Sequence, residues 1–126
     1  MNETNESIVR QFWALFSDQK WDESKLLFHR EFVVEWPQSR ERFRGCESFV
    51  EMNCAYPGTH RMEILEIISR DDVVVSTVFI SAEDTGQKAF ATSWFTIRDG
   101  KISKLKEFWG APYEAPENRK QWAERY

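Results

Sequence analysis

Apolar and polar positions alternate along the second half of the chain in a way that predicts a sheet. Four segments, about residues 60–69, 73–82, 88–97 and 102–109, have strand-like patterns and are separated by turns rich in Asp and Gly. Residues 73–80 are apolar at nearly every position, which is typical of a strand covered on both faces. We therefore expect a meander of four antiparallel strands with helices packed on one side.

The first half of the chain predicts three helices and one more strand. Residues 4–17 repeat apolar side chains at helical spacing, and residues 21–28 and 47–56 are expected to form shorter helices. Residues 30–36 alternate like a strand, and the polar segment 38–44 is expected to be a loop. This order of elements predicts an α+β domain in which helices cover a curved sheet.

Glu107 is the most unusual residue of the last predicted strand. The lysines of this strand, Lys104 and Lys106, are expected on the outer face, because lysine is rarely buried. Strand alternation then places Glu107 on the inner face, between Leu105 and Trp109. A carboxyl group with apolar neighbours is a candidate for chemistry.

The turn before this strand decides which residues share a face. A three-residue loop, Arg98-Asp99-Gly100, would group Ser93 with Glu107 on the inner face and leave Trp94 on the outer face. A two-residue turn would instead place Trp94 beside Glu107. We prefer the three-residue loop, because it groups threonines with lysines on one solvated face. The alternation of the last strand places Ile102 on this outer face as well.

Length and composition narrow the class of protein. The 126 residues predict one domain, with a core at about residues 5–110 and an extension at 111–126. The net charge is −4 and no basic stripe is present, so we expect no nucleic-acid partner. The chain shows no signal peptide and no membrane-spanning run, so we expect no membrane association. Cys46 and Cys54 are expected to be free thiols about 12 Å apart on a helix, which suits the cytoplasm.

The chain resembles the nuclear transport factor 2-like superfamily, and SnoaL-like proteins in particular. The resemblance lies in the order of the elements, the Arg44-Gly45 start of the third helix, and the runs 98–102 and 107–110. This resemblance implies a cone-shaped fold in which three helices and a curved, mainly antiparallel sheet enclose a hydrophobic pocket. It also implies relatives such as ketosteroid isomerase and polyketide cyclases, which are often dimers through the convex sheet face.

The functional groups of ketosteroid isomerase are absent at the matching positions. Its base corresponds to Trp36, its helix tyrosine to Phe12 and its protonated aspartate to Ser93. The cyclase branch is more similar, because the resemblance places its acidic residue of the last strand at Glu107. The histidine that cyclases add on the preceding strand corresponds to Ser93.

We predict Glu107 as the catalytic residue, since burial would raise its pKa toward that of a useful general base. The alternative is a structural glutamate bonded to a Trp, Tyr or Arg side chain. The candidate ligand-binding residues are Phe12, Phe16, Trp36, His60, Ser93 and Trp109. His29 is expected at the surface, and Arg40, Arg42 and Arg44 either guide an anion or lie in a solvated loop. No metal site or cofactor is predicted.

These observations predict an isomerase, lyase or cyclase that acts by proton transfer on an apolar carbonyl compound. The alternative is a non-catalytic module that binds a small hydrophobic ligand. A homodimer is expected through the outer sheet face, because Phe90, Trp94 and Phe108 would otherwise expose three large rings.

Overall fold

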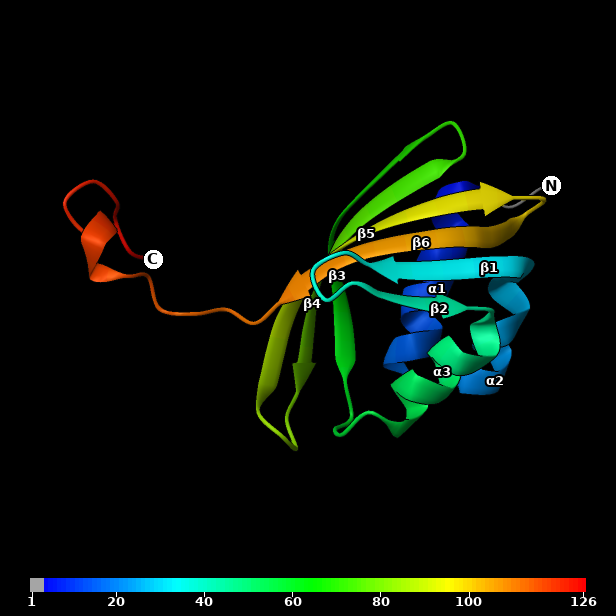
Figure 1. Cartoon of the computed structure of the whole chain (residues 1–126), viewed down its shortest axis with the longest axis horizontal. Helices are drawn as coiled ribbons and strands as arrows, with labels where there is room; N and C mark the ends of the chain where they lie inside the picture. The colour runs from blue at the N-terminus through cyan, green and yellow to red at the C-terminus, as the bar shows by residue number, and fades with distance from the viewer. Residues whose placement is uncertain (1–3) are drawn as a thin grey trace.

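Six strands form one curved sheet in the order β2-β1-β6-β5-β4-β3 (Figure 1). The computed structural model describes residues 4–126. Neighbouring strands are antiparallel except for β1 and β6, which run parallel. The strands are β1 (Phe28–Trp36), β2 (Glu41–Arg44), β3 (Arg61–Arg70), β4 (Val73–Ala82), β5 (Gln87–Arg98) and β6 (Lys101–Gly110).

Helices cover the inner face of this sheet. They are α1 (Asn5–Ser17), α2 (Trp21–Ser24) and α3 (Cys46–Ala55), with short 3₁₀ turns η1 (Lys25–Leu27) and η2 (Glu117–Arg119). Thr4 caps α1, because its hydroxyl accepts a hydrogen bond from the Ser7 N–H at 3.1 Å. The buried side of α1 presents Phe12 and Phe16 to the sheet. Trp13 Nε1 donates to Ser76 Oγ of β4 at 3.0 Å, which fixes the helix on the strand.

The fold confirms the α+β architecture, and it corrects three expectations in the first half. The predicted helix 21–28 ends at Ser24, and β1 begins at Phe28 rather than at residue 30. The predicted loop 38–44 contains an edge strand, β2. Its Arg42 donates to Glu35 Oε2 of β1 at 2.7 Å, so this strand is held by a contact between strands that local sequence does not reveal.

The turn between β5 and β6 is not the three-residue loop that we preferred, but Glu107 and Trp94 lie on the faces that this loop predicted. Asp99 and Gly100 form a two-residue turn with φ of 54° and 71°. A β-bulge then leaves Ser103 outside the ladder, since Thr96 pairs with Lys104 while Ile97 pairs with Ile102. The extra residue keeps Glu107 inward and Trp94 outward. Ile102, expected on the outer face, is buried in the core.

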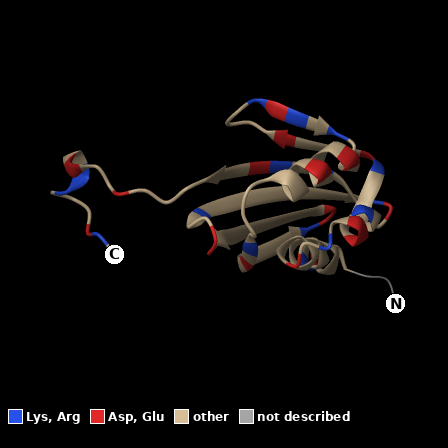
Figure 2. Cartoon of the chain, turned by 90° about the horizontal axis from the view of Figure 1, so that it is seen from below, with Lys and Arg blue, Asp and Glu red and all other residues tan. Residues whose placement is uncertain are grey.

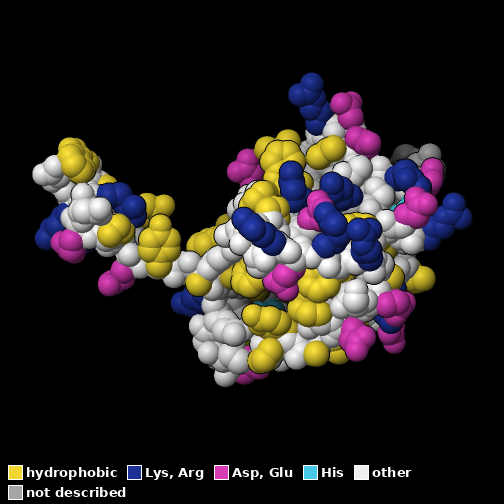
Figure 3. Space-filling view, viewed as in Figure 1, with side chains coloured by type: hydrophobic (Ala, Val, Ile, Leu, Met, Phe, Trp, Pro, Cys, Tyr) yellow, Lys and Arg dark blue, Asp and Glu magenta, His cyan; other side chains and the backbone are white. Residues whose placement is uncertain are grey.

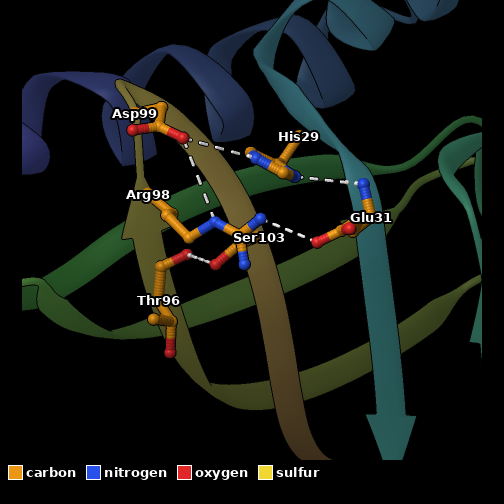
Figure 4. A network of polar contacts seen from close by, with 6 residues as sticks. All are labelled: His29, Glu31, Thr96, Arg98, Asp99 and Ser103. Carbon is orange, nitrogen blue, oxygen red and sulfur yellow. Dashed lines mark hydrogen bonds and ion pairs between the residues drawn. The ribbon is translucent and has the colours of Figure 1, made fainter.

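Polar contacts surround this bulge (Figure 4). Ser103 Oγ donates to the Thr96 carbonyl at 3.1 Å, and Arg98 Nη2 pairs with Glu31 Oε2 at 2.7 Å. His29 was expected at the surface but is buried. Its Nδ1 accepts from the Glu31 N–H at 3.0 Å, and its Nε2 lies 3.7 Å from Asp99 Oδ2. These contacts join β1, β5 and β6 at the end of the sheet.

The outer face of the sheet is the face turned away from the helices. It exposes a ring cluster, which we define as Phe90, Trp94 and Phe108, with exposed fractions of 45%, 44% and 39%. Lys106 Nζ lies 5.9 Å from the centroid of the Trp94 ring, within the range of a cation–π contact. In the view of Figure 2, basic and acidic residues are interspersed over the strands and helices.

Residues 111–126, here called the tail, leave the end of β6 and run away from the body, residues 4–110, in both views (Figures 1 and 2). The only regular structure of the tail, residues 111–126, is the 3₁₀ turn η2. Within the described residues, no helix is both long and apolar enough to cross a membrane.

Candidate functional site

A cavity of about 700 Å³ opens between the inner face of the sheet and the helices. This volume lies within the range of small-molecule sites in proteins. Aromatic rings from α1, α2, α3, β1 and β6 make much of its wall: Phe12, Trp13, Phe16, Trp21, Trp36, Phe49 and Trp109. The remaining lining comes from α3, from the strands β3 to β6 and their connecting loops, from the turn after α1, and from the first two residues of the tail.

Glu107 is the acidic side chain of this wall, and it is buried. Trp36 Nε1 of β1 donates to its Oε1 at 3.1 Å, and Ser93 Oγ of β5 donates to its Oε2 at 2.7 Å. These contacts exist because Ser93 and Glu107 are direct partners in the β5–β6 ladder, while Trp36 follows the β1 residue paired with Lys106. Three adjacent strands therefore fix the carboxyl group.

Burial raises the pKa of Glu107 above its ordinary value, because the cavity wall removes the carboxylate from water. The hydrogen bonds from Ser93 and Trp36 act in the opposite direction and are the weaker influences. No charged neighbour among the described residues contributes to the shift. A carboxylate has about four acceptor positions, so two donors leave it able to meet a ligand or accept a proton.

Trp36 connects the carboxyl group to the aromatic wall. Its ring packs edge-on against Phe43 and Trp109, with centroids 5.0 and 5.5 Å apart, and against Phe49 at 6.4 Å. Trp109 is partly exposed at the mouth, where its backbone N–H donates to Gln38 Oε1 at 2.7 Å. The carboxyl group is thus flanked by aromatic rings in the cavity wall.

A second polar region lies at the rim, away from the Glu107 hydrogen bonds. His60 Nε2 lies 2.9 Å from Gln87 Oε1, and the His60 carbonyl accepts from Gln19 Nε2 at 2.9 Å. Asn53 also lines the cavity and uses its amide N–H to bond the Phe49 carbonyl at 2.8 Å. His60 is therefore held at the rim by contacts with Gln19 and Gln87.

The structure brings together six of the seven predicted site residues on one cavity wall: Glu107, Phe12, Phe16, Trp36, His60 and Trp109. Ser93 is not part of the lining. It lies fully buried behind Glu107 and meets the cavity only through that carboxyl group. The rim residues Gln19, Asn53 and Gln87 were not predicted, because they come from three separate elements and share no local sequence pattern.

The three loop arginines do not line the cavity. Arg42 instead pairs with Glu35 on the outer face. Cys46 and Cys54 are free thiols, and Cys54 lies in the cavity wall. Across residues 4–126, no cluster of three or more His, Cys, Asp or Glu side chains could hold a metal ion.

Comparison with known proteins identifies the family. Residues 9–105 match the SnoaL-like domain, and no curated protein matches the chain. A crystal structure of a candidate ketosteroid isomerase from Kribbella flavida is similar, with a TM-score of 0.86 and 22% identity, over 97% of this chain and 89% of that chain.

Two other solved structures share the fold. An NTF-2 like protein of unknown function from Burkholderia xenovorans has a TM-score of 0.81 and 22% identity, over 97% of this chain and 94% of that one. A candidate polyketide cyclase from Sinorhizobium meliloti has a TM-score of 0.70 and 24% identity, over 80% of this chain and 93% of that one. The chain therefore belongs to the SnoaL-like domain family and has the cone-shaped α+β fold of nuclear transport factor 2-like proteins.

Proposed function

We propose that this protein is a cofactor-independent isomerase, lyase or cyclase that acts on an apolar carbonyl compound, with Glu107 as general base. The observation that supports this proposal most strongly is the buried Glu107 carboxyl group, set in an aromatic cavity wall with a raised pKa. A general base whose pKa lies near the working pH accepts a proton readily and also gives it back readily.

In the proposed step, a C–H bond beside the substrate carbonyl breaks and its proton moves to a Glu107 oxygen. The electron pair stays on the substrate as an enolate. The proton then returns to another carbon, or the enolate expels a leaving group or closes a ring. Trp36 and Ser93 act as positioning residues, because they hold the two carboxyl oxygens by hydrogen bonds.

The alternative is a binding module that uses a protonated Glu107 as a hydrogen-bond donor. Burial favours the neutral carboxyl form, which supports this reading, and both Glu107 oxygens already hold protein partners. The two functions differ in one observable, the exchange of the substrate's α-protons.

The test is α-proton exchange of a panel of apolar cyclic ketones in D₂O, followed by NMR. We expect exchange with the wild type at least about 100-fold faster than with Glu107→Gln. Glu51→Gln, an exposed change on α3, is the matched control and should behave as wild type. Tryptophan fluorescence should report ketone binding to all three proteins. Binding without exchange would favour the module, and absence of binding would remove the apolar ligand class.

We also propose a homodimer through the outer face. The exposed ring cluster supports it, because aromatic residues within a polar rim are usual at interfaces. Sedimentation should show that Trp94→Lys weakens the dimer, while Leu26→Lys, an exposed apolar site in η1, leaves it unchanged. Ketone binding should survive in both variants. A dimer of unaltered affinity in Trp94→Lys would contradict this interface.

A further inference from the structure

The tail carries large aromatic side chains that no other part of the chain covers. Tyr113 and Trp122 are 79% and 78% exposed. The polar contacts of the tail are internal: Arg125 Nη2 donates to the Ala115 carbonyl at 3.0 Å and lies 3.6 Å from Glu117 Oε1. Figure 3 shows apolar side chains on the tail, separated from the body by a narrow neck. A segment this short buries too little surface to be stable alone, so it needs a surface to pack on.

The root of the tail lies beside the ring cluster. Gly110, the last residue of β6, pairs with Phe90, and Phe108 lies two positions earlier on the same strand. A second copy seated on the ring cluster would therefore lie next to the point where the tail leaves the body. Residues 111–116 can span up to about 20 Å when extended, which is about four strand spacings.

Two solved structures align with part of the tail. The alignments with the Kribbella flavida and Burkholderia xenovorans proteins each cover 97% of this chain. Residues 1–110 are only about 87% of the 126 residues, so both alignments continue into the tail. In this structure the tail stands clear of its own body, so its exposed aromatic side chains are free to pack on a second surface.

A receiving surface exists on the outer face. A shallow groove of about 240 Å³ runs beside Trp94 and is lined also by Ile68, Val73 and Val75. Ile68 is itself exposed. The polar side chains of its lining are Arg70, Asp71 and Asp72.

We propose that the tail is exchanged between two copies of this chain, so that residues 111–126 of one copy lie on the outer sheet face of the other and bury Tyr113 and Trp122 there. The inference rests on the dimer proposed above. The exchange would also connect the dimer interface to the cavity, because Ala111 and Pro112, the first two residues of the tail, line the cavity. A tail fixed by the partner fixes that part of the mouth.

The first experiment compares the full chain with a chain ending at Pro112, and Trp122→Ala with Leu26→Ala, by sedimentation over a concentration series. We expect the dimer dissociation constant to rise at least tenfold on truncation and severalfold in Trp122→Ala, with Leu26→Ala unchanged. Thermal unfolding should show that each variant is folded. A truncated chain that dimerises as tightly as the full chain would overturn the exchange and leave the dimer standing. A full chain that is monomeric throughout would overturn both.

The second experiment places a photo-reactive phenylalanine analogue at position 122 and mixes isotopically heavy and light chains. Adducts between a heavy and a light chain, on outer-face residues such as Ile68 or Trp94, are expected. Adducts within one chain would mean that the tail folds over its own body, and adducts on another face of the second copy would place it elsewhere. Either result would overturn the proposal.

Discussion

Glu35 and Glu107 lie almost side by side in the sheet and have opposite surroundings. Glu35 of β1 pairs with Lys106 of β6, the residue just before Glu107. Strand alternation turns Glu35 to the outer face and Glu107 to the cavity. Trp36, the residue after Glu35, is then the one that donates to Glu107.

The face determines the proton affinity of each carboxyl group. A hydrogen bond from Arg42 lowers the pKa of Glu35 below its ordinary value, and Lys104 adds to this effect from 3.4 Å. Burial raises the pKa of Glu107, which has only the neutral donors Ser93 and Trp36. Two residues of one type, one strand apart, therefore differ in proton affinity, because their faces differ in burial and in the charge of the partners.

The largest difference should appear when each glutamate is replaced by lysine. Glu107→Lys places a charge in the cavity wall without a counter-charge, and we expect a loss of about 3 kcal/mol or more in the free energy of unfolding. Glu35→Lys changes a half-buried position on the outer face that remains in contact with water, and it should cost clearly less. Urea unfolding of the two variants provides the measurement. Equal losses would mean that the two faces are equally accessible to water.

A smaller effect is expected from Ser93→Ala, which removes the donor 2.7 Å from Glu107 Oε2. Loss of this bond should raise the pKa of Glu107 further and cost about 1–3 kcal/mol of stability near neutral pH. Infrared titration of the carboxyl band against Glu107→Gln measures the pKa. Ser103→Ala, which also removes a serine hydrogen bond, is the control and should leave the Glu107 band unmoved.

The pH dependence of stability gives a third test. The folded state holds the Glu107 proton more tightly than the unfolded state, whose pKa is the ordinary 4.5. The stability contributed by this group is therefore fully present below that value and is lost as pH rises through the raised folded pKa. Thermal unfolding from about pH 4 to 8 should show the wild type losing stability relative to Glu107→Gln. A relative gain with rising pH would contradict the raised pKa.

The smallest effect is expected from Glu35→Gln. The pKa of Glu35 is lowered, so its contribution is present above the ordinary value and is lost as pH falls through the folded pKa. Relative to Glu35→Gln, the wild type should therefore gain stability as pH rises, whereas relative to Glu107→Gln it should lose stability. The loss in Glu35→Gln should also disappear at about 0.5 M salt, because exposed charges are screened. A salt-independent loss would point to packing instead of charge.

Sequence alternation was enough to predict the four-strand meander, the inward Glu107 and the outward ring cluster. It could not distinguish a three-residue turn from a two-residue turn followed by a bulge, because Asp99-Gly100 suits both. The edge strand β2 depends on its pairing with β1 and on the contact of Arg42 with Glu35, which alternation within residues 38–44 does not reveal. The burial of His29 depends on packing beside Asp99, which is distant in sequence. The cavity rim likewise arises only when α1, α3 and β5 converge.

Because of the bulge at Ser103, the number of residues in this hairpin determines which face Glu107 occupies, whatever the identities of the residues in the turn. Without the bulge, Ser103 would pair with Thr96, and Glu107 would turn to the outer face while Phe108 turned to the cavity. Deletion of one residue within 101–103 could be absorbed by loss of the bulge, with every later pairing kept. Insertion of one residue cannot be compensated by loss of the bulge. It would turn Glu107 to the outer face and Phe108 to the cavity. Relatives of this chain should therefore tolerate a shorter β6 start more readily than a longer one.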